Sequence, residues 1–203
     1  MLKKIIQDNK FFYYPYFLLL ILSFAVIIQF NKGDLTIALN NSHSVGFDYF
    51  FKYFTYVGTG VFIIPMTILL YLKNRNWAYF IGACYAVNGP IVHLLKRVII
   101  TDNYRPYWAL KREFYLIPGL DIQKLHSMPS GHTNTAFFFF LGLSFFTKNT
   151  LLHLVFLACA VLVAVSRMYL YQHFLQDTVV GSIIAVVVTT SIYIFFKRKQ
   201  LLE

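Results

Sequence analysis

The chain has 203 residues, of which 58% are hydrophobic and only 13% are charged. An ordinary soluble domain is about 25% charged and about 45–50% apolar. A chain of this length has too small an interior to hide so much apolar surface from water. The composition therefore excludes an ordinary soluble domain and predicts an all-α integral membrane protein, organised as a single domain over residues 1–203.

The net charge of +10 could favour nucleic acid or anionic lipid as a partner. A nucleic-acid-binding protein carries a basic stripe on a soluble face, whereas the basic residues here stand at the ends of apolar runs, where lipid head groups lie. We therefore expect the lipid bilayer as the partner and no nucleic acid. The two cysteines, Cys84 and Cys159, lie inside apolar runs without metal-ligand spacing.

Six apolar runs follow one another along the chain, and we interpret them as six transmembrane helices. The runs are Tyr14–Phe30, Gly58–Leu72, Trp77–Leu95, Thr133–Thr147, Thr150–Val165 and Thr178–Phe196. A spanning helix needs about 17–25 residues, so the second, fourth and fifth runs must extend into flanking residues. The Phe137–Phe140 run inside the fourth is expected to face lipid or to form a packing surface.

The connections between these runs predict the orientation. Short connections dense in Lys and Arg alternate with long ones. The positive-inside rule places the short connections and both termini on the cytoplasmic side of the cell (inner) membrane. The longest outer connection, Thr101–Met128, is rich in Tyr and Trp and predicts a short interfacial helix. Phe47–Tyr56 predicts a second one.

Three polar clusters fall on the outer side in this topology. In the last of them, His173 and Asp177 are four residues apart, so on a helix they share one face. A carboxylate beside an imidazole fixes its tautomer and stabilises its cationic form. Arg167 lies six residues before His173 and could hold an anion. Alternatively, the three residues are an ion pair and an interfacial histidine at a helix end.

The middle cluster is Pro129-Ser130-Gly131-His132, at the start of the fourth run. Proline and serine suit a helix start, and the free amides there attract anions. Gly131 lets a ligand approach the backbone, and His132 is a candidate proton donor. The simpler interpretation is a helix cap followed by an incidental histidine.

The first cluster adds Lys96 and Arg105-Pro106. If the three clusters converge, they supply cations, a hydroxyl, a helix N-terminus and two imidazoles, which suits a phosphoryl group. No carboxylate cluster for Mg²⁺ and no zinc spacing is present. The cations would therefore do the work of a metal, and no cofactor is expected.

These residues resemble the type-2 phosphatidic acid phosphatase superfamily, whose pocket is related to that of the vanadium haloperoxidases. Its second motif, Pro-Ser-Gly-His, and its third, Ser-Arg-x5-His-x3-Asp, are present in full, the third as Ser166-Arg167, His173 and Asp177. The first motif is usually Lys-x6-Arg-Pro. Here Lys96 precedes Arg105 by nine positions instead of seven, so Arg97 competes for the lysine role.

The resemblance implies a metal-independent reaction through a phosphohistidine. His173 would attack phosphorus, Asp177 would hold its other ring nitrogen, and His132 would protonate the leaving oxygen and then activate water. The phosphoryl oxygens would be bound by the remaining motif residues: Lys96, Arg105, Ser130, Gly131 and Arg167.

We therefore expect a lipid phosphatase acting at the outer membrane surface. Its substrate would be phosphatidylglycerol phosphate, phosphatidic acid, undecaprenyl pyrophosphate or a lipid A phosphate, and His126 could touch it. Lys111, Arg112 and Lys124 are expected to be interfacial charges, and the alternative is that one of them binds a second phosphate of the substrate. The rival functions are a lipid phosphotransferase using the same phosphohistidine and a non-catalytic protein that binds or moves lipid phosphates.

Overall fold

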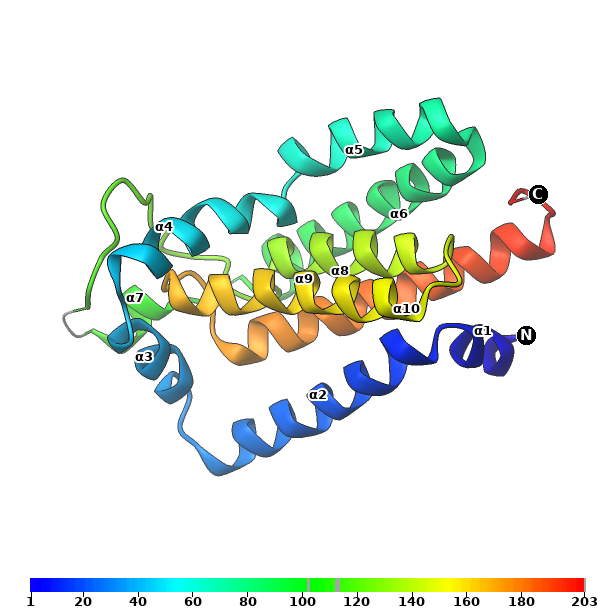
Figure 1. Ribbon diagram of the computed structural model, residues 1–203. Coiled ribbons are helices and arrows are strands. Elements are labelled where there is room, and N and C mark those ends of the chain that lie inside the picture. Colours follow the sequence, from blue (N-terminus) through cyan, green and yellow to red (C-terminus); the bar gives the residue numbers. More distant parts are fainter. Residues whose placement is uncertain (102, 112–113, 203) are drawn as a thin grey trace.

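The computed structural model describes residues 1–101, 103–111 and 114–202, and every regular element in that part of the chain is a helix. In chain order the elements are α1 (Leu2–Asp8), α2 (Lys10–Gln29), α3 (Asp34–Asn41), α4 (Val45–Phe54), η1 (Thr55–Gly58), α5 (Gly60–Lys73), α6 (Arg75–Leu94), η2 (Leu95–Ile99), α7 (Pro106–Leu110), α8 (Gly131–Ser144), α9 (Thr150–Tyr169) and α10 (Leu175–Arg198). Both termini lie at one end of the bundle, and α3, α4 and α7 lie at the other (Figure 1).

Four helices are long and apolar enough to cross a membrane: α2, α6 with η2, α9 and α10. The segments Val45–Gly58 and Gly60–Lys73, bent by 55° at their junction, pass the same test together. These elements match five of the six apolar runs, so the chain is an all-helical protein with several apolar spans. The sixth run corresponds to α8, and six complete spans remain a prediction.

Helix α8 has 14 residues, which corresponds to a length of about 21 Å against a hydrocarbon core of about 30 Å. It can be short because it lies at the centre of the bundle, in contact with α6, α9 and α10. Residues Phe137–Phe140 are all buried there, so they form a packing surface and do not face lipid. Irregular backbone at membrane depth is tolerated when protein surrounds it, and Ser127 and Ser130, which precede α8, are 0% exposed.

Both segments for which the sequence predicts interfacial helices contain short helices: α7 lies within Thr101–Met128, and α4 with η1 covers Phe47–Tyr56. Their place at the membrane interface stays a prediction. Helix α3 was not anticipated. Asp48 of α4 accepts hydrogen bonds from Tyr169 Oη (2.5 Å) and Tyr115 Oη (2.9 Å). This buried carboxylate therefore ties α4 to α9 and to the connection that follows α7.

Candidate active site

The structure brings the three motif clusters together at the end of the bundle opposite the termini. Lys96 lies in η2, Arg105 immediately precedes α7, and Ser130 precedes α8. Arg167 lies in the last turn of α9, and His173 lies in the turn that leads into α10. Asp177 lies in the first turn of α10.

His173 and Asp177 form a buried pair at the start of α10. The side chains are 1% and 0% exposed, and 3.5 Å separate His173 Nδ1 from Asp177 Oδ2. The carboxylate also accepts a hydrogen bond from the Phe174 backbone N–H (2.9 Å). Asp177 thus closes the turn that carries His173 and sets the orientation of its ring, which leaves Nε2 as the nitrogen directed away from the carboxylate.

Ser127 contacts this pair, and the sequence motifs give no reason to expect it there. Its hydroxyl donates to Asp177 Oδ2 at 2.5 Å, and its backbone acts electrostatically on the His173 ring. Ser127 is 0% exposed. It therefore holds in place the carboxylate that faces the imidazole. The only signal in the sequence is a hydroxyl two residues before Pro129.

Arg167 is buried at the centre of the site without a carboxylate partner within ion-pair distance, as far as the described residues extend. Its Nη1 donates to Thr55 Oγ1 at 2.8 Å, and its Nε has no partner within that same part of the chain. A buried guanidinium is costly unless its charge and its donors are satisfied. This arrangement therefore suits an anion.

Arg105 is held by neutral oxygens. Its Nε donates to the Leu125 carbonyl (3.2 Å), and its two terminal nitrogens donate to the side-chain oxygens of Gln123 (3.1 Å) and Gln172 (2.5 Å). These bonds fix the direction of the guanidinium, and the carboxylates of Asp177 and Asp121 act on its charge without an ion pair within 4.0 Å among the described residues. Gln172 stands directly before His173, and the sequence analysis did not single it out.

Lys96, and not Arg97, lies with the other motif residues. Lys96 is half-buried and interacts electrostatically with Arg105, Arg167 and Asp177, whereas Arg97 is exposed. The helix widens here into a π turn, in which the Ile100 N–H donates to the Leu95 carbonyl (2.8 Å). A π turn uses more residues per turn than an α-helix. It lies in the same segment in which Lys96 precedes Arg105 by nine positions instead of the seven usual in the family.

The Pro-Ser-Gly-His segment forms the N-terminus of α8. Ser130 Oγ accepts from Thr133 Oγ1 (2.9 Å) and from the Thr133 N–H (3.4 Å). A Cβ added at Gly131 would meet only Val92 at 3.9 Å, so the backbone there is approachable. His132 is acted on by the charges of Arg167, Lys96 and Arg105 and interacts with His173, so it belongs to the same group.

Two glycines from other elements let the backbone of this segment pack closely. A Cβ at Gly58 would lie 2.6 Å from the His132 carbonyl oxygen, and one at Gly181 would lie 2.6 Å from the Ser130 carbonyl oxygen. The Ser130 N–H also donates to the Asp177 carbonyl at 2.9 Å. The end of α8 is therefore held rigidly between η1 and α10.

The electrostatic environment keeps His173 neutral. Burial lowers the pKa of His173 well below its ordinary value, and the cations Arg105, Lys96 and Arg167 lower it further. A neutral imidazole has a free lone pair on one ring nitrogen. The site thus combines a neutral imidazole with three cations around it.

The described residues contain no group of three or more His, Cys, Asp or Glu side chains arranged to hold a metal ion. His126 Nδ1 lies 3.0 Å from the Lys96 carbonyl oxygen. The Lys124 ammonium lies 5.5 Å from the Trp108 ring centroid and 5.9 Å from that of Tyr104. Lys111 ends α7 in a left-handed conformation, and Arg112 lies outside the described residues.

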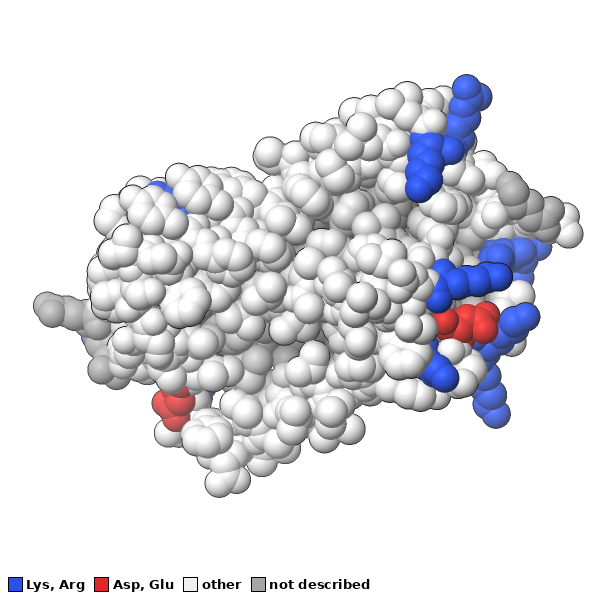
Figure 2. All heavy atoms as spheres, viewed as in Figure 1, with Lys and Arg blue, Asp and Glu red and all other residues white. Residues whose placement is uncertain are grey.

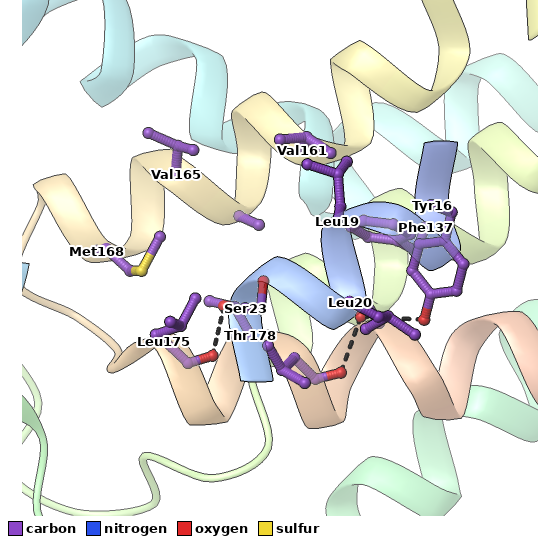
Figure 3. A pocket seen from close by; sticks show the side chains of 13 residues that line it. Tyr16, Leu19, Leu20, Ser23, Phe137, Val161, Val165, Met168, Leu175 and Thr178 are labelled. Atoms are coloured by element: carbon purple, nitrogen blue, oxygen red, sulfur yellow. Dashed lines mark hydrogen bonds between the residues drawn. The ribbon is translucent and has the colours of Figure 1, made fainter. Parts of the chain in front are cut away.

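An apolar crevice of about 130 Å³ lies between α2, α9 and α10, with Tyr16, Leu20, Val161, Met168 and Thr178 in its lining (Figure 3). None of Lys96, Arg105, His132, Arg167, His173 and Asp177 is among its lining residues. The crevice is therefore separate from the candidate site.

The sequence profile of the PAP2 superfamily matches residues 58–201. The chain belongs to the PAP2 superfamily. The match includes all three motif clusters and begins at Gly58, the glycine that packs against His132. No curated protein matches the chain.

Two solved structures share the fold. The Aquifex aeolicus LpxE structure is 25% identical, with a TM-score of 0.72, over 82% of this chain and 98% of that one. A transmembrane PAP2-type phosphatidylglycerolphosphate phosphatase from Bacillus subtilis is 20% identical, with a TM-score of 0.67, over 95% of this chain and 97% of that one. The family assignment agrees with the resemblance found in the sequence.

Proposed function

We propose that the chain, as a single membrane phosphatase domain, hydrolyses the phosphate ester or pyrophosphate of a membrane lipid. The observation that carries the proposal is the convergence of Lys96, Arg105 and Arg167 on a buried, neutral His173. Cations placed around a nucleophile can bind a phosphoryl group and stabilise the charge that spreads over its oxygens in the transition state. A PAP2 relative that acts on phosphatidylglycerolphosphate supports the lipid substrate.

In the first step, His173 Nε2 attacks phosphorus while the bond from phosphorus to the lipid oxygen breaks. His132 donates its proton to that oxygen. A bound phosphate favours the charged form of His132. Asp177 stabilises the positive charge on the His173 ring through Nδ1.

In the second step, His132, now neutral, takes a proton from water, and the oxygen of this water attacks the phosphohistidine. The nitrogen–phosphorus bond breaks, phosphate leaves, and neutral His173 is restored. Splitting hydrolysis into two steps is the general benefit of covalent catalysis. No metal takes part in either step.

The site lies at the end of the bundle that we place on the periplasmic or extracellular side, with both termini in the cytoplasm. Figure 2 shows Lys and Arg side chains gathered at the end that carries the termini, which supports this orientation. A lipid with its tail in the bilayer would then present its head group at the outer surface. Phosphatidylglycerol phosphate, phosphatidic acid, undecaprenyl pyrophosphate and lipid A phosphates are the substrates to test.

The test is phosphate release from this panel by detergent-purified protein in EDTA. His153 provides a matched control, because it is also a buried histidine (1% exposed) but contacts the Thr147 carbonyl near the termini. Wild type and His153→Ala should release phosphate, whereas His173→Ala and His132→Ala should lose at least about a hundredfold. Equal rates in all four proteins would overturn the proposal, and a new phosphoester in place of free phosphate would indicate a phosphotransferase.

A further inference from the structure

A second cluster of cations surrounds a cavity at the opposite end of the bundle. The cavity has a volume of about 660 Å³ and lies between α1, α10 and the connection from α8 to α9. Lys4, Lys148 and Lys197 contribute to its lining, one from each of these segments. This volume is within the range of about 300–1,000 Å³ that is usual for small-ligand sites.

The charge of this cavity is not balanced by its own lining. Among the residues that the structure describes, Asp8 is the one carboxylate in the lining, and no ion pair within 4.0 Å joins it to any of the three lysines. Figure 2 shows basic side chains with an acidic group among them at this end of the molecule. Three ammonium groups around one hollow favour a ligand with more than one negative oxygen.

The other lining residues complete an amphipathic site. The Phe145 and Tyr193 rings stack at a centroid distance of 4.0 Å, and Lys197 Nζ stands 5.8 Å from the Tyr193 centroid. Asn9 and Thr147 add polar groups. Basic pockets between membrane helices at the cytoplasmic surface suit the head groups of anionic lipids.

We propose that this cavity binds a phosphate-bearing anion and is a site distinct from the candidate active site. The shared chemistry is a phosphate group held by Lys4, Lys148 and Lys197. Its source is either the head group of an anionic phospholipid in the adjacent leaflet or a soluble phosphate. The proposal does not depend on the chain being a phosphatase.

The test compares two triple variants in detergent. Lys4→Gln/Lys148→Gln/Lys197→Gln removes the cavity cations, and Lys73→Gln/Arg75→Gln/Lys199→Gln removes the same charge from residues outside the cavity lining. The binding constants of dioleoyl-phosphatidylglycerol and of inorganic phosphate are measured from thermal stabilisation. Dioleoyl-phosphatidylcholine and chloride at equal ionic strength are the control ligands. Phosphate release by each protein is measured alongside as a test of the other site.

One of the two phosphate probes should stabilise the wild type more than the control ligands do. The cavity triple should weaken that binding by about fivefold per lysine, or about a hundredfold in all, while the control triple changes it much less. Stabilisation by the lipid alone identifies the head group as the source, and stabilisation by inorganic phosphate identifies a soluble anion. If neither probe stabilises the wild type more than phosphatidylcholine and chloride do, or if the two triples lose binding equally, the proposal is overturned, whatever the phosphate-release assay shows.

Discussion

The two ends of the bundle both carry positive charge, but they hold it differently. At the motif end, Arg105 and Arg167 are 7% and 5% exposed and are directed by hydrogen bonds to neutral oxygens. At the end with the termini, the lysines are exposed around a wide cavity. Burial strengthens the electrostatic interactions of a charge because water cannot screen them. We therefore assign catalysis to the first end and only binding to the second.

The largest expected difference between the two ends of the bundle is the effect on kcat of removing one arginine from each end. Arg167→Gln should lower kcat by about a hundredfold to a thousandfold, because it removes a buried cation next to the transferred phosphoryl group. Arg75→Gln, at the other end, should leave kcat within about twofold. Phosphate release from the preferred lipid measures both variants.

The same pair also tests what the buried charge does to stability. Because Arg167 has no carboxylate partner among the described residues, its replacement by a neutral side chain should not lower the midpoint of thermal unfolding. A large drop in this midpoint would mean that Arg167 holds the fold together, and the loss of activity would then say nothing about catalysis.

A second comparison uses neighbours in the π turn. Lys96→Gln should lower kcat/KM by at least about thirtyfold, because Lys96 lies among the motif cations, whereas Arg97→Gln should change it by less than about threefold. The measurement is kcat/KM for the same lipid. If Arg97→Gln shows the larger loss, the assignment of Lys96 is wrong.

A third comparison uses two serines that are both 0% exposed. Ser127→Ala removes the donor to Asp177 and should lower kcat about tenfold with little change in KM, since the ring of His173 is less well oriented. Ser127→Thr, which keeps the hydroxyl, should recover part of the rate. Ser144→Ala serves as the control because Ser144 donates to the Leu141 carbonyl within α8, and it should have no effect on kcat.

The smallest expected effect is that the acid limb of the pH–rate profile lies below the ordinary pKa of histidine. A lowered pKa keeps His173 neutral at pH values below the ordinary histidine pKa of about 6.5, so activity should fall only below that pH. In the enzyme–substrate complex the bound phosphate favours the charged form of His132, and deprotonation of His132 at alkaline pH should lower the rate. The profile of kcat, which reports the enzyme–substrate complex, should therefore be bell-shaped. An acid limb above pH 6.5, or a flat profile between about pH 5 and 9, would contradict these protonation states.

The sequence predicts the long spans well because a continuous apolar run is a local property of the chain. It also predicts the motif residues that converge, since their types and order are those of the family. It could not predict the partners that orient them. Thr55 meets Arg167 across 112 positions, and Ser127 meets Asp177 across 50. Such pairs exist only after the helices have packed, and hydroxyl residues are too common for their spacing to indicate a contact.

The short length of α8 was only partly predictable for the same reason. The fourth run is visibly short for a span, but the sequence does not show that protein surrounds it. The burial of Ser127, Ser130 and the four phenylalanines reveals this enclosure. The wider turn at Lys96 is likewise invisible until the backbone is known.

The most direct test of the proposed mechanism is to trap the covalent phosphoryl group. Wild-type protein is mixed with a lipid phosphate labelled with ³²P, quenched in alkali after a series of short times and digested for mass spectrometry. The mechanism predicts an acid-labile phosphoryl group on the peptide that contains His173, and its absence in the His173→Ala variant. Phosphate release by the wild type from the same lipid, with no label on His173 at any quench time, would contradict it.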